Sequence, residues 1–274
     1  MSDYTFSPAL ERAGIAEYVK LFETAFPGDT KLSAAYLEWL YIQNPHGRVI
    51  GTDAFAGDRL AAHYAIMPRR YALGGQSYDA ALSINTATHP DHQGKGLFTK
   101  LADATYERAA AQGVRFVLGA ANANSVGGFT RKLGFTALGQ IRLYLGFQPP
   151  AATGDDLDLM TDDHWIAWRL ANPSRVYTSR RLGNGDACIS TRVRGVPFHL
   201  GRLRAADLGF QPANQLAPLP GFSPVFASPS PNGLKLPAKY QPSPWHVIWR
   251  ELDPALSPSA RTQLRIDGLA MDTF

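Results

Sequence analysis

One segment, residues 83–101 (SINTATHPDHQGKGLFTKL), constrains the fold of this chain more than any other. A stretch with β-branched residues ends at Thr88, a proline turn follows, and Gln93-Gly94-Lys95-Gly96 leads into a helical pattern. Glycines let backbone N–H groups approach an anion without interference from a Cβ atom. The following helix points its unpaired N–H groups and the positive end of its dipole at the same place. The segment therefore predicts a strand, a diphosphate-binding turn and a helix, in that order.

Two common phosphate loops can be compared with this segment position by position. A Walker A loop needs glycine five residues before its Gly-Lys pair and serine or threonine directly after it, whereas the chain has His89 and Gly96. The Rossmann fingerprint needs a third glycine, but the run from Gly94 reads GKGLFT and ends in Thr99. The segment matches neither loop.

Hydrophobic periodicity predicts the elements on either side of the segment. We expect helices over 7–26, 31–43, 97–112 and 125–133, the last of them with Asn124 as its N-cap. We expect strands over 49–56, 60–68, 78–88 and 114–120, and one or two closing strands within 135–147. The fold class is therefore α/β (α+β), with a largely antiparallel start to a mixed sheet.

The C-terminal part of the chain has a different character. Eleven of the 20 prolines lie between Pro212 and Pro258, which predicts irregular connections around short strands and no central strand; the best strand candidates are 245–252 and 263–269. A tryptophan-bearing helix, an Asn-Pro break and an Arg-Val pair occur both before Val49 and before Val176. This is either a faint internal repeat or a coincidence between two helix ends. We predict two domains, 1–149 and 150–274, the second a degenerate half-repeat without its own glycine-rich loop.

Composition excludes several classes of protein. With 45% hydrophobic and 18% charged residues the chain can form a substantial core, and it contains no apolar run long enough to span a bilayer. No disulfide within the chain is expected, because Cys188 is the only cysteine. No signal peptide is expected either, because the N-terminus lacks a basic patch followed by an apolar stretch. We therefore expect a cytoplasmic protein. No metal site is predicted. The net charge of +4 is scattered along the chain, which favours no nucleic-acid partner.

Two blocks of the sequence together resemble the GNAT acetyltransferase family over about residues 5–147. The first is HPDHQGKGLFTKL, which is similar to the family's coenzyme A loop, Arg/Gln-x-x-Gly-x-Gly/Ala, except that Phe98 replaces the final small residue. The second begins at Asn122-Ala-Asn124-Ser125 and ends in Lys132-Leu133-Gly134-Phe135. The nearest likeness is to bacterial GNAT proteins of surface-polysaccharide gene clusters. The resemblance implies a GNAT fold, here followed by a smaller C-terminal α+β half-GNAT-like domain.

The resemblance also implies acetyl-CoA as cosubstrate and a set of residues that bind it. Pantetheine would lie along the end of strand 78–88, the diphosphate would bind amides of the glycine loop, and the asparagine block would contact the cofactor from the next strand end. Asn124 has the alternative role of a plain helix cap. The predicted cofactor-binding residues are Thr86, Ala87, Thr88, Gln93, Gly94, Lys95, Gly96, Leu97, Phe98, Asn122, Asn124 and Phe129.

Amide formation from a thioester requires a neutral amine, a stabilised oxyanion and a leaving thiolate. Since an amine of the lysine type has a pKa of about 10.4, a base or a water chain must remove its proton. A backbone amide around Thr86–Thr88 is the natural oxyanion donor. The tyrosine that GNAT enzymes often supply as acid is absent, since Thr130 stands at its position, and Tyr144, or else Tyr64, is the replacement we expect. The candidates for the base are Glu23 and His63, then Glu38, Asp79 and the carboxylate of Phe274.

Each catalytic candidate also has an ordinary structural role. A tyrosine on a strand is more often part of the core, and a histidine in an apolar strand is more often a hydrogen-bonded core residue. We expect an N-acetyltransferase that acts on a small polar amine, with an amino sugar as the first choice. The alternatives are a catalytically silent acyl-CoA-binding protein and a GNAT protein that uses another acyl donor. The oligomeric state is not predicted.

Overall fold

The computed structural model describes residues 4–29, 31–150, 156–205, 209, 219–227, 233–237, 239, 241, 245–256 and 258–271. Its first sheet has the order β1-β2-β3-β4-β5-β14-β6, and β8 also pairs with β3. Neighbouring strands are antiparallel except for β4 and β5, which are parallel. The strands are β1 (Thr5–Pro8), β2 (Ile50–Ala56), β3 (Arg59–Leu73), β4 (Gln76–Thr88), β5 (Phe116–Ala121), β6 (Thr136–Gln140), β8 (Asp158–Leu159) and β14 (His246–Glu251).

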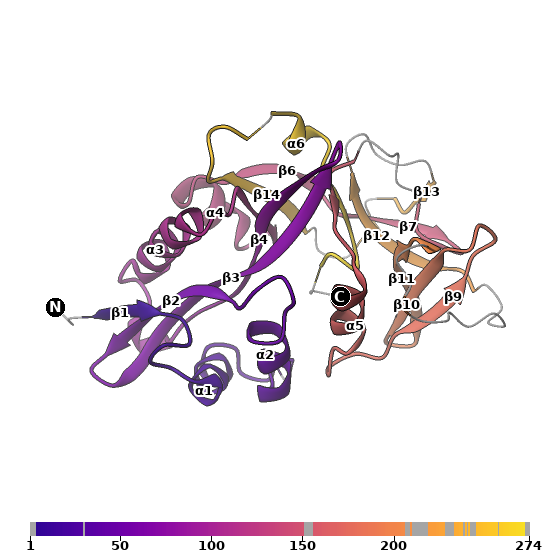
Figure 1. Ribbon diagram of the computed structural model, residues 1–274. Helices are drawn as coiled ribbons and strands as arrows, with labels where there is room; N and C mark the ends of the chain where they lie inside the picture. The colour runs from indigo at the N-terminus through magenta and orange to yellow at the C-terminus, as the bar shows by residue number, and fades with distance from the viewer. Residues whose placement is uncertain are drawn as a thin grey trace.

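The second sheet lies beside the first in Figure 1 and has the order β13-β7-β12-β11-β10-β9, with β15 also paired to β12. Within it β9, β10 and β11 are antiparallel, and β11 is parallel to β12. Antiparallel strands followed by one parallel pair is also the order of β2, β3, β4 and β5 in the first sheet. The strands are β7 (Arg142–Gly146), β9 (Thr178–Arg181), β10 (Ala187–Val193), β11 (Val196–Leu203), β12 (Gly221–Ala227), β13 (Leu234–Lys235) and β15 (Arg265–Asp267).

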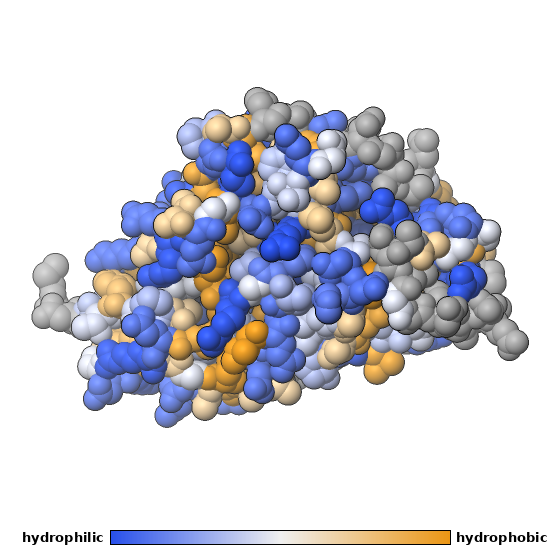
Figure 2. Space-filling model, viewed as in Figure 1, coloured by the Kyte–Doolittle hydropathy of each residue, from blue (hydrophilic) through white to orange (hydrophobic). Residues whose placement is uncertain are grey.

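Helices cover both faces of the first sheet. α3 (Leu97–Ala111) and α4 (Val126–Lys132) pack on one face, and α1 (Ile15–Ala25) and α2 (Ala34–Tyr41) on the other, as Figure 1 shows. The core under α1 and α2 continues past α5 (Asp163–Leu170) into the second sheet, since Leu37, Trp165 and Leu200 belong to one buried cluster. Figure 2 shows a mostly hydrophilic surface, with hydrophobic side chains reaching it in a band near α1 and α2. The remaining helices are short: η1 (Pro90–His92) and α6 (Pro258–Thr262).

The two sheets exchange strands. β7 follows β6 directly along the chain, yet it pairs with β12 in the second sheet. In return β14, from near the end of the chain, lies antiparallel between β5 and β6 and completes the first sheet. The mixed α/β fold class and the presence of two sheet-containing halves are confirmed. The boundary between residues 149 and 150 stays a prediction, and the pairing of β14 crosses it.

A reciprocal pair of tryptophans joins the halves at α2 and α5. The indole rings of Trp39 and Trp168 stack with their centroids 4.4 Å apart and an angle of 8° between their planes. Nε1 of Trp39 donates to the backbone oxygen of Trp168 at 2.8 Å, and Nε1 of Trp168 donates to that of Trp39 at 2.9 Å. The contact therefore has approximate twofold symmetry between α2 and α5, the two helices that precede the Asn-Pro breaks.

Three expectations from the sequence are wrong in detail. The first helix begins at Ile15, because residues 5–8 form β1 beside β2 and Leu10 has a left-handed φ of 64°. The closing strands belong to different sheets. Pro224 lies inside β12, a central strand, at the point where the parallel pairing with β11 has ended and the pairing with β15 has not begun. A missing N–H is tolerated at such a change of partner.

None of the helices in the described ranges is both long and apolar enough to cross a membrane.

The position of β14 predicts the result of truncation. A chain ending at Pro150 loses β14. The edges of β5 and β6 that pair with β14 are then left without a hydrogen-bonding strand, and Phe116 loses the stacked ring of Trp249 that covers it in the core. Open apolar edges promote aggregation. We expect the truncated chain to be insoluble or molten in size-exclusion chromatography and near-UV circular dichroism. A monodisperse fragment with native near-UV signals would contradict this topology.

The tryptophan pair predicts a measurable cost for a single donor. Trp168→Phe keeps an aromatic ring but removes the N–H group that satisfies the buried carbonyl of Trp39, so the free energy of unfolding should fall by about 1–3 kcal/mol in urea. His164→Ala, on the exposed side of the same helix, is the matched control and should change it by less than about 0.5 kcal/mol. Equal urea midpoints of unfolding for the two variants would show that the hydrogen bond from Trp168 to Trp39 contributes nothing to stability.

Candidate functional site

The strands β4 and β5 separate part of the way along their length. They pair only where Ala80–Leu82 lies beside Phe116–Leu118. Beyond Leu82, β4 pairs with β3 alone, and β5 pairs with β14 alone. The end of β4 thus presents a row of backbone N–H and C=O groups toward the gap, and such groups bind an extended ligand as a further strand would.

A β-bulge lies in β4 at this gap. His63 pairs with Ala87 and Ala65 with Ile84, so two residues of β4 face one of β3. Asn85 is one of the two and has φ +35°, an unusual conformation for a residue other than glycine. A bulge re-aims the backbone, and bulges are frequent beside active sites. The bulge therefore indicates that the gap between β4 and β5 is a candidate binding site.

The loop after β4 has the open shape that an anion site needs. Gly94 and Gly96 both have φ +72°, and no atom lies within 4 Å of a Cβ built on either of them. Gly96 is the N-cap of α3, so the free amides of the first turn of this 15-residue helix begin there. The side chain of Gln93 donates to the carbonyl of Thr88 at 3.3 Å, and Lys95 Nζ donates to that of Asp91 at 3.0 Å. These bonds hold the loop against the end of β4.

The asparagine block lies at the end of β5, beside this loop. Oδ1 of Asn122 accepts hydrogen bonds from the amides of Asn124 and Ser125, both at 3.0 Å. Asn122 thus closes a turn just before α4. The prediction of Asn124 as N-cap is wrong, because Ser125 holds that place, with no capping hydrogen bond to its side chain. Phe129 of α4 packs edge-to-face on Phe98 of α3, with ring centroids 5.6 Å apart. The structure therefore brings both sequence blocks together.

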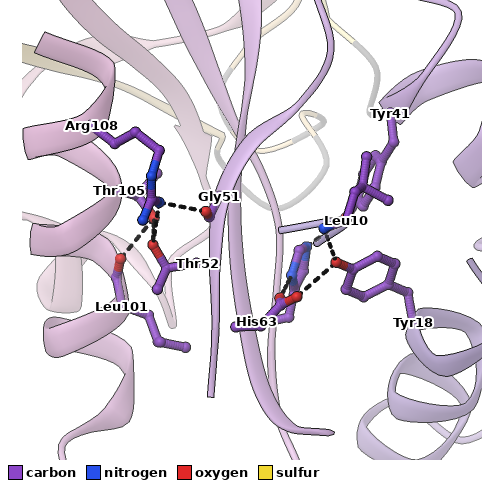
Figure 3. Close-up of polar contacts among 10 residues, drawn as sticks. Leu10, Tyr18, Tyr41, Gly51, Thr52, His63, Leu101, Thr105 and Arg108 are labelled. Atoms are coloured by element: carbon purple, nitrogen blue, oxygen red, sulfur yellow. Dashed lines mark hydrogen bonds and ion pairs between the residues drawn. The ribbon is translucent and has the colours of Figure 1, made fainter. Parts of the chain in front are cut away.

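A buried polar network lies on the other face of the sheet (Figure 3). Nδ1 of His63 is 2.6 Å from Oδ1 of Asp53, and both side chains are fully buried. The Tyr18 hydroxyl donates to Oδ2 of Asp53 at 2.7 Å and accepts the amide of Leu10 at 2.7 Å. The Tyr41 hydroxyl is 2.9 Å from Nε2 of His63. Burial and the charge of Asp53 raise the pKa of Tyr18, so this hydroxyl stays protonated.

On the face under α3, a second set of hydrogen bonds surrounds the same strands. The Tyr64 hydroxyl contacts Oγ of Ser83 at 3.0 Å and the hydroxyl of Tyr106. Burial raises the pKa of Tyr64 to about 12, against the opposing effect of both hydrogen bonds. Ser83 is the first residue of β4 beyond the pairing with β5, and it lies next to Gly119 across the gap. Tyr64, the second choice for the acid, therefore lies where the gap opens.

The other catalytic candidates lie apart from one another. Tyr144 is buried on β7 in the second sheet, opposite Ser223. Glu23 on α1 and Glu38 on α2 are exposed, and Asp79 is exposed on β4 with Arg70 3.4 Å from it. Phe274 lies outside the described residues. Among the candidates for base or acid, His63 and Tyr64 are the two that lie on β3 beside the bulge.

Sequence reasoning missed four residues of the buried network and the bulge: Tyr18, Tyr41, Asp53 and Asn85. A signal existed for one of them, since Asp53 is the single charged residue in the run IGTDAFA. A carboxylate in a buried strand needs a partner. Nothing in the sequence shows that Tyr18 and Tyr41, on two different helices, would converge on it.

Comparisons with known proteins agree with this fold. The model of the Acetyltransferase (GNAT) domain family matches residues 9–138, a little under half of the chain. A probable N-acyltransferase from Enterococcus faecalis V583, otherwise of unknown function, superposes with a TM-score of 0.63 at 11% identity, over 92% of this chain and 73% of that one. A GCN5-related N-acetyltransferase from Kribbella flavida gives 0.62 at 13% identity, over 92% and 72%. No curated protein matches by sequence. At these identities the structures show a shared fold.

The buried network predicts the effect of removing its outer hydroxyl. Tyr18→Phe leaves Oδ2 of Asp53 and the amide of Leu10 each short of a partner, so the free energy of unfolding should fall by about 1–3 kcal/mol in urea. Lys20→Ala, exposed on the same helix, should change it by less than about 0.5 kcal/mol. A Tyr18→Phe variant as stable as the parent protein would contradict the network as described.

Proposed function

We propose that this chain is an acetyl-CoA-dependent N-acetyltransferase whose acceptor is a small polar amine. The observation that carries the proposal is the gap between β4 and β5, which opens next to the glycine loop at the start of α3. A free strand edge and a helix N-terminus in one place suit a ligand with an amide-bearing arm and a diphosphate. The match of residues 9–138 to an acetyltransferase domain supports the same reading.

The chain's own residues fit the cofactor in the order that its chemistry requires. Thr86, Ala87 and Thr88 would pair with the pantetheine amides along the free edge of β4. Backbone amides from Gln93 to Phe98 would hold the diphosphate, where Gly94 and Gly96 leave the surface open. Asn122, Asn124 and Phe129 would border it from the end of β5. Acetyl-CoA supplies an acyl group activated as a thioester.

Catalysis then requires three things of the protein: a donor for the oxyanion, a route for the amine proton and a donor for the thiolate. The backbone at the β4 bulge would supply N–H groups on the side of the gap. Among the predicted acids, Tyr64 is the one at the gap: it remains protonated at neutral pH and, although fully buried itself, its hydroxyl hydrogen-bonds to Ser83 where the gap opens. Glu23, His63 and Tyr144 remain proposals for catalytic roles.

An amino sugar is the first acceptor to test, since the sequence resembles GNAT proteins of surface-polysaccharide gene clusters. A second function, a catalytically silent acyl-CoA-binding protein, is favoured by one observation. Thr130 replaces the usual tyrosine on α4, and its hydroxyl donates to the carbonyl of Val126 at 3.0 Å within the helix. The two functions share the cofactor site and differ in turnover.

We also infer that residues 150–274 hold a degenerate repeat of the first half. Support comes from the equivalent strand order of β2–β5 and β9–β12, from the exchange of β7 and β14, and from the reciprocal pair Trp39 and Trp168. Such a half would form a wall for the acceptor, since ligand sites favour junctions between domains.

Binding of CoA to glycine variants tests the proposed cofactor site. In Gly96→Ala a side chain must adopt φ +72°, a strain of about 1–2 kcal/mol that the loop relieves by shifting its amides away from the diphosphate, so the affinity for CoA should fall about tenfold in calorimetry. Gly57→Ala is the matched control, because Gly57 has φ +61° with equally open surroundings at the turn between β2 and β3. Its CoA affinity should equal that of the parent protein.

Thiol release from acetyl-CoA in the presence of an amine panel separates the two functions. Amine-dependent release above the hydrolysis background supports the transferase. Tight CoA binding without such release, across amino sugars and other small amines, would favour the silent binding protein.

Equal CoA affinity for the Gly57→Ala and Gly96→Ala variants would place the diphosphate elsewhere.

A further inference from the structure

The buried network on β2 and β3 carries an inference about the reaction itself, which rests on the proposed function. Asp53 and His63 are both fully buried, yet they lie in a face that could have been filled with hydrocarbon. A buried charged or polar group is costly unless it is fully hydrogen-bonded, and well-packed apolar residues often stabilise a fold as well or better. Stability alone therefore does not explain why these polar residues are buried here, and we expect a role in the reaction.

The hydrogen bonds of the network have a consistent direction. Oδ2 of Asp53 accepts from Tyr18, and Oδ1 accepts from Nδ1 of His63. In the tautomer with its proton on Nδ1, His63 presents the lone pair of Nε2 to the Tyr41 hydroxyl 2.9 Å away. The oxygen of Tyr41 is then left as an acceptor, and the carboxylate fixes the orientation of every group between it and Tyr41.

His63 places this chain beside the bulge in β4, because its backbone pairs with Ala87, and Asn85 lies between that pair and the pair of Ala65 with Ile84. Burial raises the pKa of Tyr41, and the side-chain amide of Asn85 opposes that rise. Nδ2 of Asn85 is itself buried and has no hydrogen-bond partner among the described residues. Asn85 is also the residue with φ +35°, a conformation that persists only where the surroundings hold it. A fixed His63 at the edge of the bulge is therefore a means of holding the backbone of Asn85.

We propose that Asp53, His63 and Tyr41 are positioning residues that hold Asn85 in its bulged conformation and thereby aim the backbone amides of β4 at the acyl carbonyl. They act through the backbone of Asn85 and do not touch the substrate. This gives His63 a role different from that of a general base, since its two ring nitrogens already face Asp53 and Tyr41. The network sets the geometry of the oxyanion donor, which catalysis needs within a fraction of an ångström.

The test compares Tyr41→Phe with Tyr71→Phe. Both remove one buried hydroxyl from a side chain in the same core cluster, but Tyr71 lies at the opposite end of β3, across from Tyr78. For Tyr41→Phe we expect kcat to fall at least tenfold, while the KM for acetyl-CoA and the Kd for CoA stay within twofold. Tyr71→Phe should keep all three values. His63→Gln should repeat the Tyr41→Phe result, and it serves if Tyr41→Phe does not fold.

Hydrogen exchange supplies a readout that does not depend on turnover. The amides of residues 83–88 should exchange faster in Tyr41→Phe and His63→Gln than in the parent protein and in Tyr71→Phe. Unchanged kcat and unchanged exchange in a folded Tyr41→Phe variant would overturn the positioning role while leaving the transferase intact. A parent protein that binds no CoA would overturn the proposed function, and the exchange data would still decide whether the network holds the bulge.

Discussion

The separation of β4 from β5 is the constraint on which the rest of this structure depends. Two parallel strands that pair for three residues and then diverge leave backbone donors and acceptors without a ladder partner. Such groups are costly unless water or a ligand satisfies them. Keeping the gap open requires support from both sides, and the structure supplies it. β3 holds β4 along almost its whole length, and β14 holds β5 along all of its own.

That support explains why the C-terminal half cannot be regarded as an appendage. β14 comes from near the end of the chain and lies in the first sheet between β5 and β6. β7 comes from the N-terminal half and pairs with β12 in the second sheet. The stacked pair Trp39 and Trp168 then joins the helices that flank the exchange. Because each half completes the other, one buried cluster runs through both.

The glycine loop between β4 and α3 could be predicted from sequence because its signals are local. Glycines at Gly94 and Gly96, a β-branched strand before them and an amphipathic helix after them all act within 20 residues, and the strands, loop and helix occur as expected. The exchange of β7 and β14 could not be predicted, since a strand's pattern shows which face is buried but not which neighbour it pairs with. The buried hydrogen-bond network could not be predicted for the same reason. Tyr18, Tyr41 and Asp53 come from three elements, and only the folded sheet brings them together.

A crystal structure of the protein bound to CoA tests the central claim most directly. The account predicts the pantetheine arm between the diverging ends of β4 and β5, hydrogen-bonded to the backbone of residues 86–88. It also predicts the diphosphate on the amides that precede and begin α3. A diphosphate bound at another surface, or a gap closed by direct pairing of β4 with β5 beneath the bound ligand, would contradict it.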